Sequence, residues 1–128
     1  MFSSRPRSLA QRKGLFYEKL ALKYLQGQGL SLLSQNFHCR FGEVDLILSD
    51  QGSIVFAEVR YRNNEVFGLA HETVDWHKQQ KLIKCARYYL LRQGLYDRCD
   101  ARFDVVSISG RDKHAEIRWF KNAFIPAS

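Results

Sequence analysis

Two stretches in the first half of the chain, residues 42–49 and 53–62, are rich in Val, Ile, Leu and Phe, which is typical of β-strands. The segment Asp50-Gln51-Gly52-Ser53 between them is a turn signal, so the two strands are predicted to form a hairpin. Side chains alternate between the two faces of a strand. In the second strand one face carries Ile54, Phe56, Glu58, Arg60 and Arg62, and the other carries Val55, Ala57, Val59 and Tyr61.

Apolar residues at helical spacing predict a helix on each side of this hairpin. The first covers about residues 11–28, ends at Gly27 and Gly29, and has the apolar stripe Leu15, Ala21, Leu22 and Leu25. Glu18 falls on that stripe, where a carboxylate either pairs with Lys19 or Lys23 at the edge or serves a site. The second helix covers residues 76–92 between the N-cap Asp75 and Gly94, with the stripe Leu82, Ile83, Ala86 and Leu90.

The remaining strands are predicted over residues 30–35, 102–109 and 116–121, with a flexible N-terminus over residues 1–10 and a tail over residues 122–128. The order is therefore helix, three strands, helix, two strands. No internal repeat or linker divides the 128 residues, so we expect one α/β domain with a central mixed sheet flanked by helices.

Each strand of the hairpin carries a carboxylate, Asp45 or Glu58, where a core strand normally carries Val or Ile. If the register brings both to one face, two like charges converge, and they repel unless a cation lies between them or one carboxyl keeps its proton. Lys78 is at the edge of the second helix's stripe. From there its ammonium either reaches the strand ends or stays in solvent.

The net charge and the cysteine content indicate the kind of partner and the cellular compartment. The net charge of +7 favours a polyanionic partner such as nucleic acid. The three cysteines have no CxxC spacing, which favours free thiols and a reducing cytoplasm. No apolar run approaches the roughly 18 residues of a membrane span, and no secretory signal is present, so no membrane partner is predicted.

All-oxygen donors such as Asp45, Glu58 and the Val59 carbonyl suit Mg²⁺ or Mn²⁺. Such an ion polarises phosphoryl oxygens and lowers the pKa of bound water, which phosphodiester hydrolysis requires. The chain has no Gly-rich phosphate loop and no GxSxG motif, and its four histidines are scattered.

An ordered set of motifs resembles the YraN family. The motifs are Gly42-Glu43-Val44-Asp45-Leu46, Phe56-Ala57-Glu58-Val59-Arg60-Tyr61-Arg62, Phe67-Gly68, Lys78-Gln79 and Arg102-Phe103-Asp104-Val105. That family belongs to the restriction-endonuclease-like PD-(D/E)xK superfamily and is similar to archaeal Holliday-junction resolvases. The resemblance implies a restriction-endonuclease-like fold, a Mg²⁺- or Mn²⁺-dependent endodeoxyribonuclease acting on branched or damaged DNA, and a homodimer.

By position, the resemblance makes Asp45 and Glu58 metal ligands and assigns Glu18 to the helix glutamate that helps hold the metal or its water. Arg60 stands where the superfamily has lysine, and an arginine stays protonated and cannot act as a general base. We therefore expect Arg60 to bind phosphate and Lys78 to supply the ammonium. Arg62 and Gln79 are further candidates for contact with nucleic acid.

Two alternatives remain open. The first is a nucleic-acid-binding module that has the nuclease fold but no turnover, because the change from lysine to arginine affects the catalytic cation. The second is an interaction protein in which Asp45–Arg60 and Glu58–Arg62 are ordinary ion pairs.

Overall fold

The computed structural model describes residues 8–62, 74–110 and 114–126, and their side chains except those of Ala10 and Arg62. These residues form two helices and five strands in the predicted order. The elements are α1 (Leu9–Gly27), β1 (Ser31–Cys39), β2 (Gly42–Asp50), β3 (Ser53–Arg62), α2 (Trp76–Arg92), β4 (Ala101–Ser109) and β5 (Glu116–Phe124). The motif Phe67-Gly68 lies outside the described residues.

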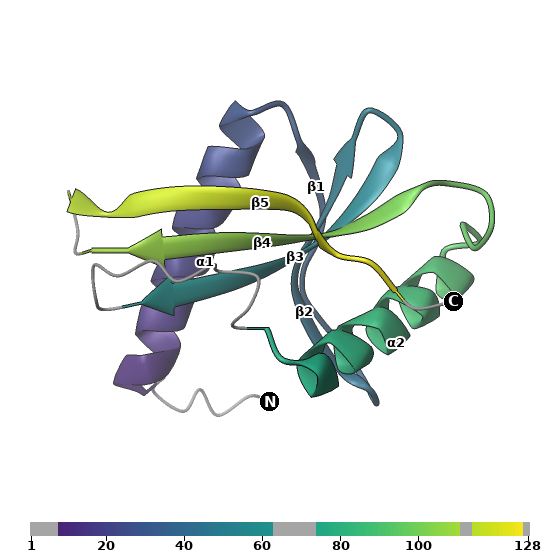
Figure 1. Cartoon of the computed structure of the whole chain (residues 1–128), viewed down its shortest axis with the longest axis horizontal. Coiled ribbons are helices and arrows are strands. Elements are labelled where there is room, and N and C mark those ends of the chain that lie inside the picture. The colour runs from purple at the N-terminus through teal and green to yellow at the C-terminus, as the bar shows by residue number, and fades with distance from the viewer. Residues whose placement is uncertain (1–7, 63–73, 111–113, 127–128) are drawn as a thin grey trace, which may run out of the picture.

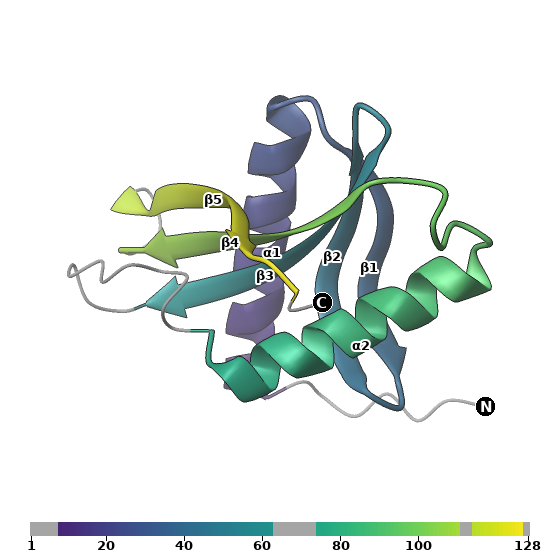
Figure 2. The same cartoon turned by 45° about the vertical axis from the view of Figure 1, so that its right-hand side comes forward.

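The five strands form one mixed sheet in the order β1-β2-β3-β4-β5. Neighbouring strands are antiparallel except β3 and β4, which run parallel and are joined through α2. The two helices lie on opposite faces of this sheet (Figures 1 and 2). The prediction of an α/β fold with a central mixed sheet between helices is confirmed, and the architecture is consistent with a restriction-endonuclease-like fold.

Each face of the sheet has its own apolar core. On the α2 side, Ile54 and Phe56 pack with α2, and on the α1 side, Val55 and Ala57 pack with α1. This division is the one that the alternation along β3 predicted. Leu82, Ile83, Ala86 and Leu90 form the buried stripe of α2 as expected, together with Cys85 and Tyr89.

The first helix begins earlier than predicted. Ser8 is its N-cap and forms a capping box with Gln11, which satisfies backbone groups at the helix start, so residues 9 and 10 are helical rather than a flexible end. Its buried stripe is Tyr17, Ala21 and Leu25, whereas Leu15 is only half-buried. Tyr17 takes the core position because its ring stacks on Tyr61 of β3, with centroids 3.8 Å apart.

The edge strands are also longer than predicted. β1 continues to Cys39, although Asn36 has a left-handed φ of 52°, a conformation that asparagine tolerates better than most residues. β5 continues to Phe124, which stacks on Phe103 with centroids 4.9 Å apart, so residues 122–124 belong to the sheet rather than to a tail.

All three cysteines are free thiols, as predicted. In the part of the chain that the structure describes, neither helix is long and apolar enough to cross a membrane.

Candidate functional site

The two strands of the central hairpin separate at the position of the predicted carboxylates. The β2–β3 ladder runs from the Asp50–Ser53 pair to the Leu46–Ala57 pair, and the next residues along the same register are Asp45 and Glu58. At this fork the carboxylate of Asp45 replaces a backbone acceptor of the ladder, because its Oδ2 accepts a hydrogen bond from the Val59 backbone N–H at 2.9 Å. A carboxylate thus completes the hydrogen bonding of a strand at the end of its ladder.

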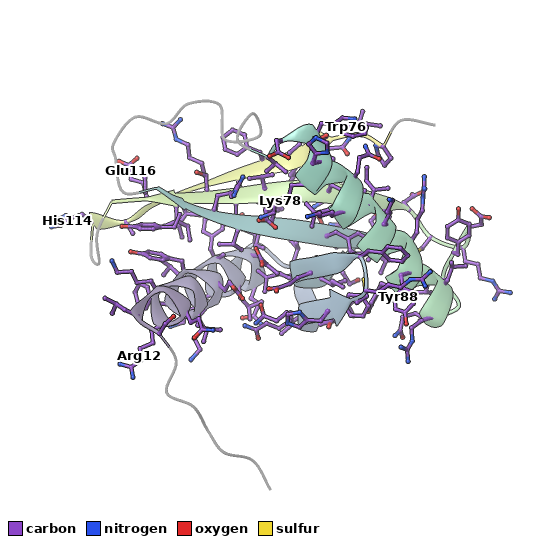
Figure 3. The ribbon with its side chains drawn as sticks, turned by 90° about the horizontal axis from the view of Figure 1, so that it is seen from below. Arg12, Trp76, Lys78, Tyr88, His114 and Glu116 are labelled. Atoms are coloured by element: carbon purple, nitrogen blue, oxygen red, sulfur yellow. The ribbon has the colours of Figure 1, made fainter. Side chains whose placement is uncertain are left out.

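Glu58 is buried, with 4% of its surface exposed, and it forms an ion pair with Lys78. Lys78 lies in the first turn of α2, after the N-cap Asp75, and the helix carries it over the strands (Figure 3). Because the N-cap fixes where α2 starts, it also sets the position of Lys78 relative to β3.

Glu18 reaches the same fork from α1, on the other side of the sheet. A hydrogen bond from the Asn36 side chain favours its charged form, but burial and the carboxylates of Glu43 and Glu58 prevail and raise the pKa of Glu18. One oxygen of Glu18, Oε1, is buried without a hydrogen-bond partner. An unsatisfied buried carboxylate oxygen is costly and is a feature of sites that bind a cation or donor.

The geometry raises the pKa of Asp45 to about 8. Burial is the largest cause, and the Glu58 carboxylate is the next. The Val59 N–H and the Lys78 ammonium act in the opposite direction but do not compensate. Asp45 therefore holds its proton at neutral pH unless more positive charge enters the fork.

Three cavities meet around these side chains. The largest, about 500 Å³, lies beneath the start of α2 and is lined by residues that include Asp45, Glu58, Lys78 and Lys81. A second, about 320 Å³, brings together Glu18, Asp45, Glu58, Arg60 and Lys78. A third, about 360 Å³, continues from Glu18 along α1 to Asn36 and Glu43. We call the space formed by these cavities the fork cleft.

The predicted site residues divide into three groups. Glu18, Asp45, Glu58, Arg60 and Lys78 share one cavity. Gln79 donates from its side-chain nitrogen to the Val74 carbonyl oxygen at 2.8 Å, which holds the start of α2, so its contact with nucleic acid stays a prediction. Arg62 ends β3, and its side chain lies outside the described part, as does the suggested Glu58–Arg62 pair.

Sequence reasoning missed Asn36 and Glu43. Gln35 pairs with Leu46 and Phe37 with Val44, so Asn36 lies opposite Asp45 in the register. Its side chain bonds to Glu18. Sequence reasoning placed Asn36 outside the strand, because the strand was predicted only over residues 30–35, whereas β1 continues to Cys39. Glu43 lines two of the three cavities and adds negative charge near Glu18.

Within residues 8–62, 74–110 and 114–126, no group of three or more His, Cys, Asp or Glu side chains is close enough to hold a metal ion. The fork offers a carboxylate pair with an ammonium beside it, and a third carboxylate on the other wall. Such a site can attract a cation, exchange a proton near neutral pH, and direct positive side chains at an anion.

These features define an α/β protein with an acidic cleft at a fork in a mixed sheet, with a helix on each face. Residues 17–108 match the family model described as "Uncharacterised protein family UPF0102", so the chain belongs to that family. The match confirms the YraN-like resemblance at the level of the family and covers both strands of the fork.

The chain is similar to UPF0102 proteins of several bacteria. It is 45% identical to one from Legionella pneumophila (strain Philadelphia 1) over 91% of this chain and 97% of that protein. It is 44% identical to one from Stutzerimonas stutzeri over 91% of this chain and 98% of that protein. It is 46% identical to one from Aliivibrio fischeri (strain MJ11) over 88% of this chain and 91% of that protein.

Proposed function

We propose that this protein is a divalent-metal-dependent endonuclease that hydrolyses phosphodiester bonds in DNA, with the fork cleft as its active site. The observation that carries the proposal is the convergence of Asp45 and Glu58 beside Lys78, with Glu18 and Arg60 on the same cavity. The resemblance of these positions to the PD-(D/E)xK nuclease pattern supports it. A net charge of +7 would favour association with a polyanionic substrate.

The residues at the fork fit a hard divalent cation such as Mg²⁺ or Mn²⁺. Two carboxylates face each other closely enough for Glu58 to raise the pKa of Asp45, and Oε1 of Glu18 is buried without a partner. Carboxylate oxygens are the donors these ions prefer, and Mg²⁺ usually takes only one or two of them besides water and substrate oxygens. Asp45 and Glu58 would be direct ligands, and Glu18 would hold a water.

When bound, the ion would polarise a phosphoryl oxygen and supply a water of lowered pKa. Asp45 must lose its proton to take part, and positive charge entering the fork favours that loss. The Lys78 ammonium would then move away from Glu58 and donate hydrogen bonds to a non-bridging phosphate oxygen, where negative charge develops.

Arg60 has a different task from that of the lysine it replaces. Its guanidinium stays protonated and can bind two phosphate oxygens at once, so it would orient the scissile phosphate in the cavity it shares with Asp45. The ammonium would come from Lys78 on α2, so that one cation positions the phosphate and the other stabilises the transition state.

A cleavage panel of duplex, single-stranded, flap and four-way DNA with Mg²⁺ or Mn²⁺ tests the proposal. We expect cleavage of at least one substrate, and a loss of at least about 100-fold in rate for Asp45→Asn. The matched control is Asp97→Asn, an exposed residue in the turn between α2 and β4 with a φ of 61°, which asparagine tolerates. The control should cut like the wild type.

The panel also separates the second candidate, a nucleic-acid-binding module with this fold and no turnover. Arg60 in place of lysine is the observation that favours it. Protein that binds branched DNA tightly, yet cuts none of the substrates with either metal, would establish the binding module and refute the nuclease.

A further inference from the structure

The exposed side of α2 carries a stripe of basic residues. The helix carries five Lys and Arg residues and no Asp or Glu. Its buried stripe faces the sheet, so residues 77, 81, 84, 88 and 92, which recur at three- and four-residue intervals, share the opposite side. These are His77, Lys81, Lys84, Tyr88 and Arg92. We call this stripe the α2 ridge.

The ridge begins at the fork cleft, because His77 and Lys81 line its largest cavity. It runs outward along the helix to a cluster of rings and guanidinium groups. There Arg92 donates to the Tyr88 hydroxyl at 3.2 Å, the Tyr88 ring lies 6.4 Å from the Phe41 ring, and Arg40 lies 4.8 Å over Phe41. These contacts hold both arginines in place at the surface, which reduces the entropy that a phosphate contact would cost.

We propose that the α2 ridge binds the backbone of a double-stranded nucleic-acid arm that leaves the fork cleft. This inference rests on the proposed function, because it assigns the surface that carries the substrate away from the site. From residue 77 to residue 92, at about 1.5 Å per residue, the ridge extends about 22 Å. Duplex DNA rises about 3.4 Å per base pair, so the ridge matches about six base pairs.

Charge complementarity favours a duplex over a single strand. The ridge lies on the exposed side of a helix and carries the cations Lys81, Lys84 and Arg92. The Tyr88 ring between them is half-buried and covered by the Arg92 guanidinium, so it offers no free ring on which an unpaired base could stack. Lys84 and Arg92 can each neutralise one phosphate, as can Arg40 beside them. Such contacts bind every sequence alike and weaken steeply with salt.

The test measures the Kd of a labelled 20-base-pair duplex over a series of salt concentrations, in the non-cutting Asp45→Asn background. The ridge variant is Arg40→Gln, Lys84→Gln, Arg92→Gln. We expect its Kd to rise at least about 10-fold at 0.1 M salt. The slope of log Kd against log salt should fall by about 0.9 for each phosphate that the variant no longer neutralises. Circular dichroism checks that the variant is folded.

The control removes the same charge elsewhere, with Lys19→Gln, Lys23→Gln and Lys121→Gln at exposed positions of α1 and β5. Equal losses in both variants would overturn the ridge, since net charge alone would explain them. A ridge variant that loses binding to anionic lipid vesicles but keeps duplex affinity would also overturn it. A wild type that never cuts, but depends on the ridge for binding, would refute turnover and leave the ridge intact.

A second observation is independent of nucleic acid. The thiols of Cys39, at the end of β1, and Cys85, in the buried stripe of α2, have their sulfur atoms 3.1 Å apart. Cys39 is half-buried, so a small oxidant can reach it, whereas burial raises the pKa of Cys85 to about 12. The pair lies beside the fork cleft, because a Cβ at Gly42 would lie 3.7 Å from the Cys85 sulfur.

We propose that Cys39 and Cys85 form a disulfide when the protein meets a peroxide. The oxygen–oxygen bond of hydrogen peroxide breaks and the sulfur–sulfur bond forms. The two thiols give up two protons and two electrons, and two waters leave. The bond joins the β1–β2 corner to α2 across 46 positions of sequence, a separation at which a cross-link stabilises the folded state.

Peptide mapping without reductant after peroxide treatment checks this directly. We expect a Cys39–Cys85 linked peptide about two mass units lighter than the sum of its reduced parts, and a Tm raised by at least about 5 °C. Cys99→Ser should behave like the wild type, and Cys39→Ser should show neither change. Oxidation of Cys39 only to sulfenic or sulfinic acid, or a link that involves Cys99, would refute the proposal.

Discussion

Two aspartates within the apolar strands of this protein occupy similar places and have opposite surroundings. Asp104 of β4 is fully buried, and its Oδ1 accepts the Asn122 backbone N–H at 2.9 Å, where the β4–β5 register shifts. Asp45 of β2 accepts the Val59 N–H at 2.9 Å, where the β2–β3 ladder ends. Each carboxylate therefore satisfies a strand whose regular pairing is interrupted.

The difference lies in what else faces each carboxylate. Asp104 also accepts hydrogen bonds from the Arg102 guanidinium and, at 2.9 Å, from the Trp119 indole, and Arg102 in turn pairs with Asp50. Asp45 instead faces Glu58 and Glu18. The Asp104 carboxylate belongs to a closed, neutralised network that links β2, β4 and β5. The surroundings of Asp45 instead have an excess of negative charge. Burial alone does not distinguish a functional carboxylate, but the balance of its neighbours does.

The largest expected effect is at the closed network. Asp104→Asn would turn an amide NH₂ toward the Arg102 guanidinium and either the Trp119 indole or the Asn122 N–H, and would remove the buried anionic partner of Arg102. We expect the free energy of unfolding to fall by about 3–5 kcal/mol. Urea unfolding at pH 7 measures it. A loss below about 1 kcal/mol would mean that the network is not closed in solution.

The same substitution at the fork should act in the opposite direction. Asp45→Asn keeps an oxygen for the Val59 N–H and removes a carboxylate that repels Glu58. Without metal, we expect the free energy of unfolding at pH 8 to rise by about 1–2 kcal/mol. Addition of Mg²⁺ should raise the Tm of the wild type and leave that of the variant unchanged. Destabilisation of Asp45→Asn would favour the interpretation of the fork as an ordinary structural ion-pair site.

The pH dependence of stability should also come from the fork. The folded pKa of Asp45, about 8, lies above its ordinary value of 3.8, so the folded state binds the proton more tightly. Its contribution is fully present at low pH and is lost as the pH rises toward 8. The pKa of Glu18 is raised too, which acts in the same direction. Without metal, we expect the free energy of unfolding to fall by up to about 1.4 kcal/mol per pH unit between pH 5 and 8.

Denaturant unfolding across that range, with Asp45→Asn as the comparison, measures this effect. The variant should show a flatter profile. An equally steep profile in the variant would place the responsible group elsewhere in the molecule.

The smallest expected change in the free energy of unfolding follows from replacing Lys78, the cation of the fork. Lys78→Met removes the partner of Glu58, but the lysine side chain is 40% exposed and solvent weakens the pair. We expect a loss of about 1 kcal/mol at pH 7. Because Lys78 lowers the pKa of Asp45, the pH range over which stability is lost should also move upward in this variant. If this pH range is the same in the variant and the wild type, Lys78 does not act on Asp45.

Local pattern in the sequence determined a large part of this protein. Period-two alternation assigned the faces of β3 correctly, and the bounds of α2 follow from its apolar spacing, N-cap and terminating glycine. The same alternation, with the turn at residues 50–53, indicated that Asp45 and Glu58 converge if the register brings both to one face. These features depend on residues a few positions apart, so the chain records them locally.

Tertiary structure decided the rest. Tyr17 replaces Leu15 in the core because Tyr61, forty-four positions away, offers a ring to stack on. Glu18 is a site residue because Asn36 of β1 reaches it, and Lys78 faces the fork because α2 begins there and pairs it with Glu58. Asp45 and Asp104 look alike as single acids within apolar strands. Arg102, two positions away on the same strand, gives Asp104 its guanidinium, but only the packing of β5 adds the Trp119 indole and the Asn122 N–H. Only the packing of β3 and α1 gives Asp45 two more carboxylates, since these neighbours are set by the folded chain and not by spacing along it.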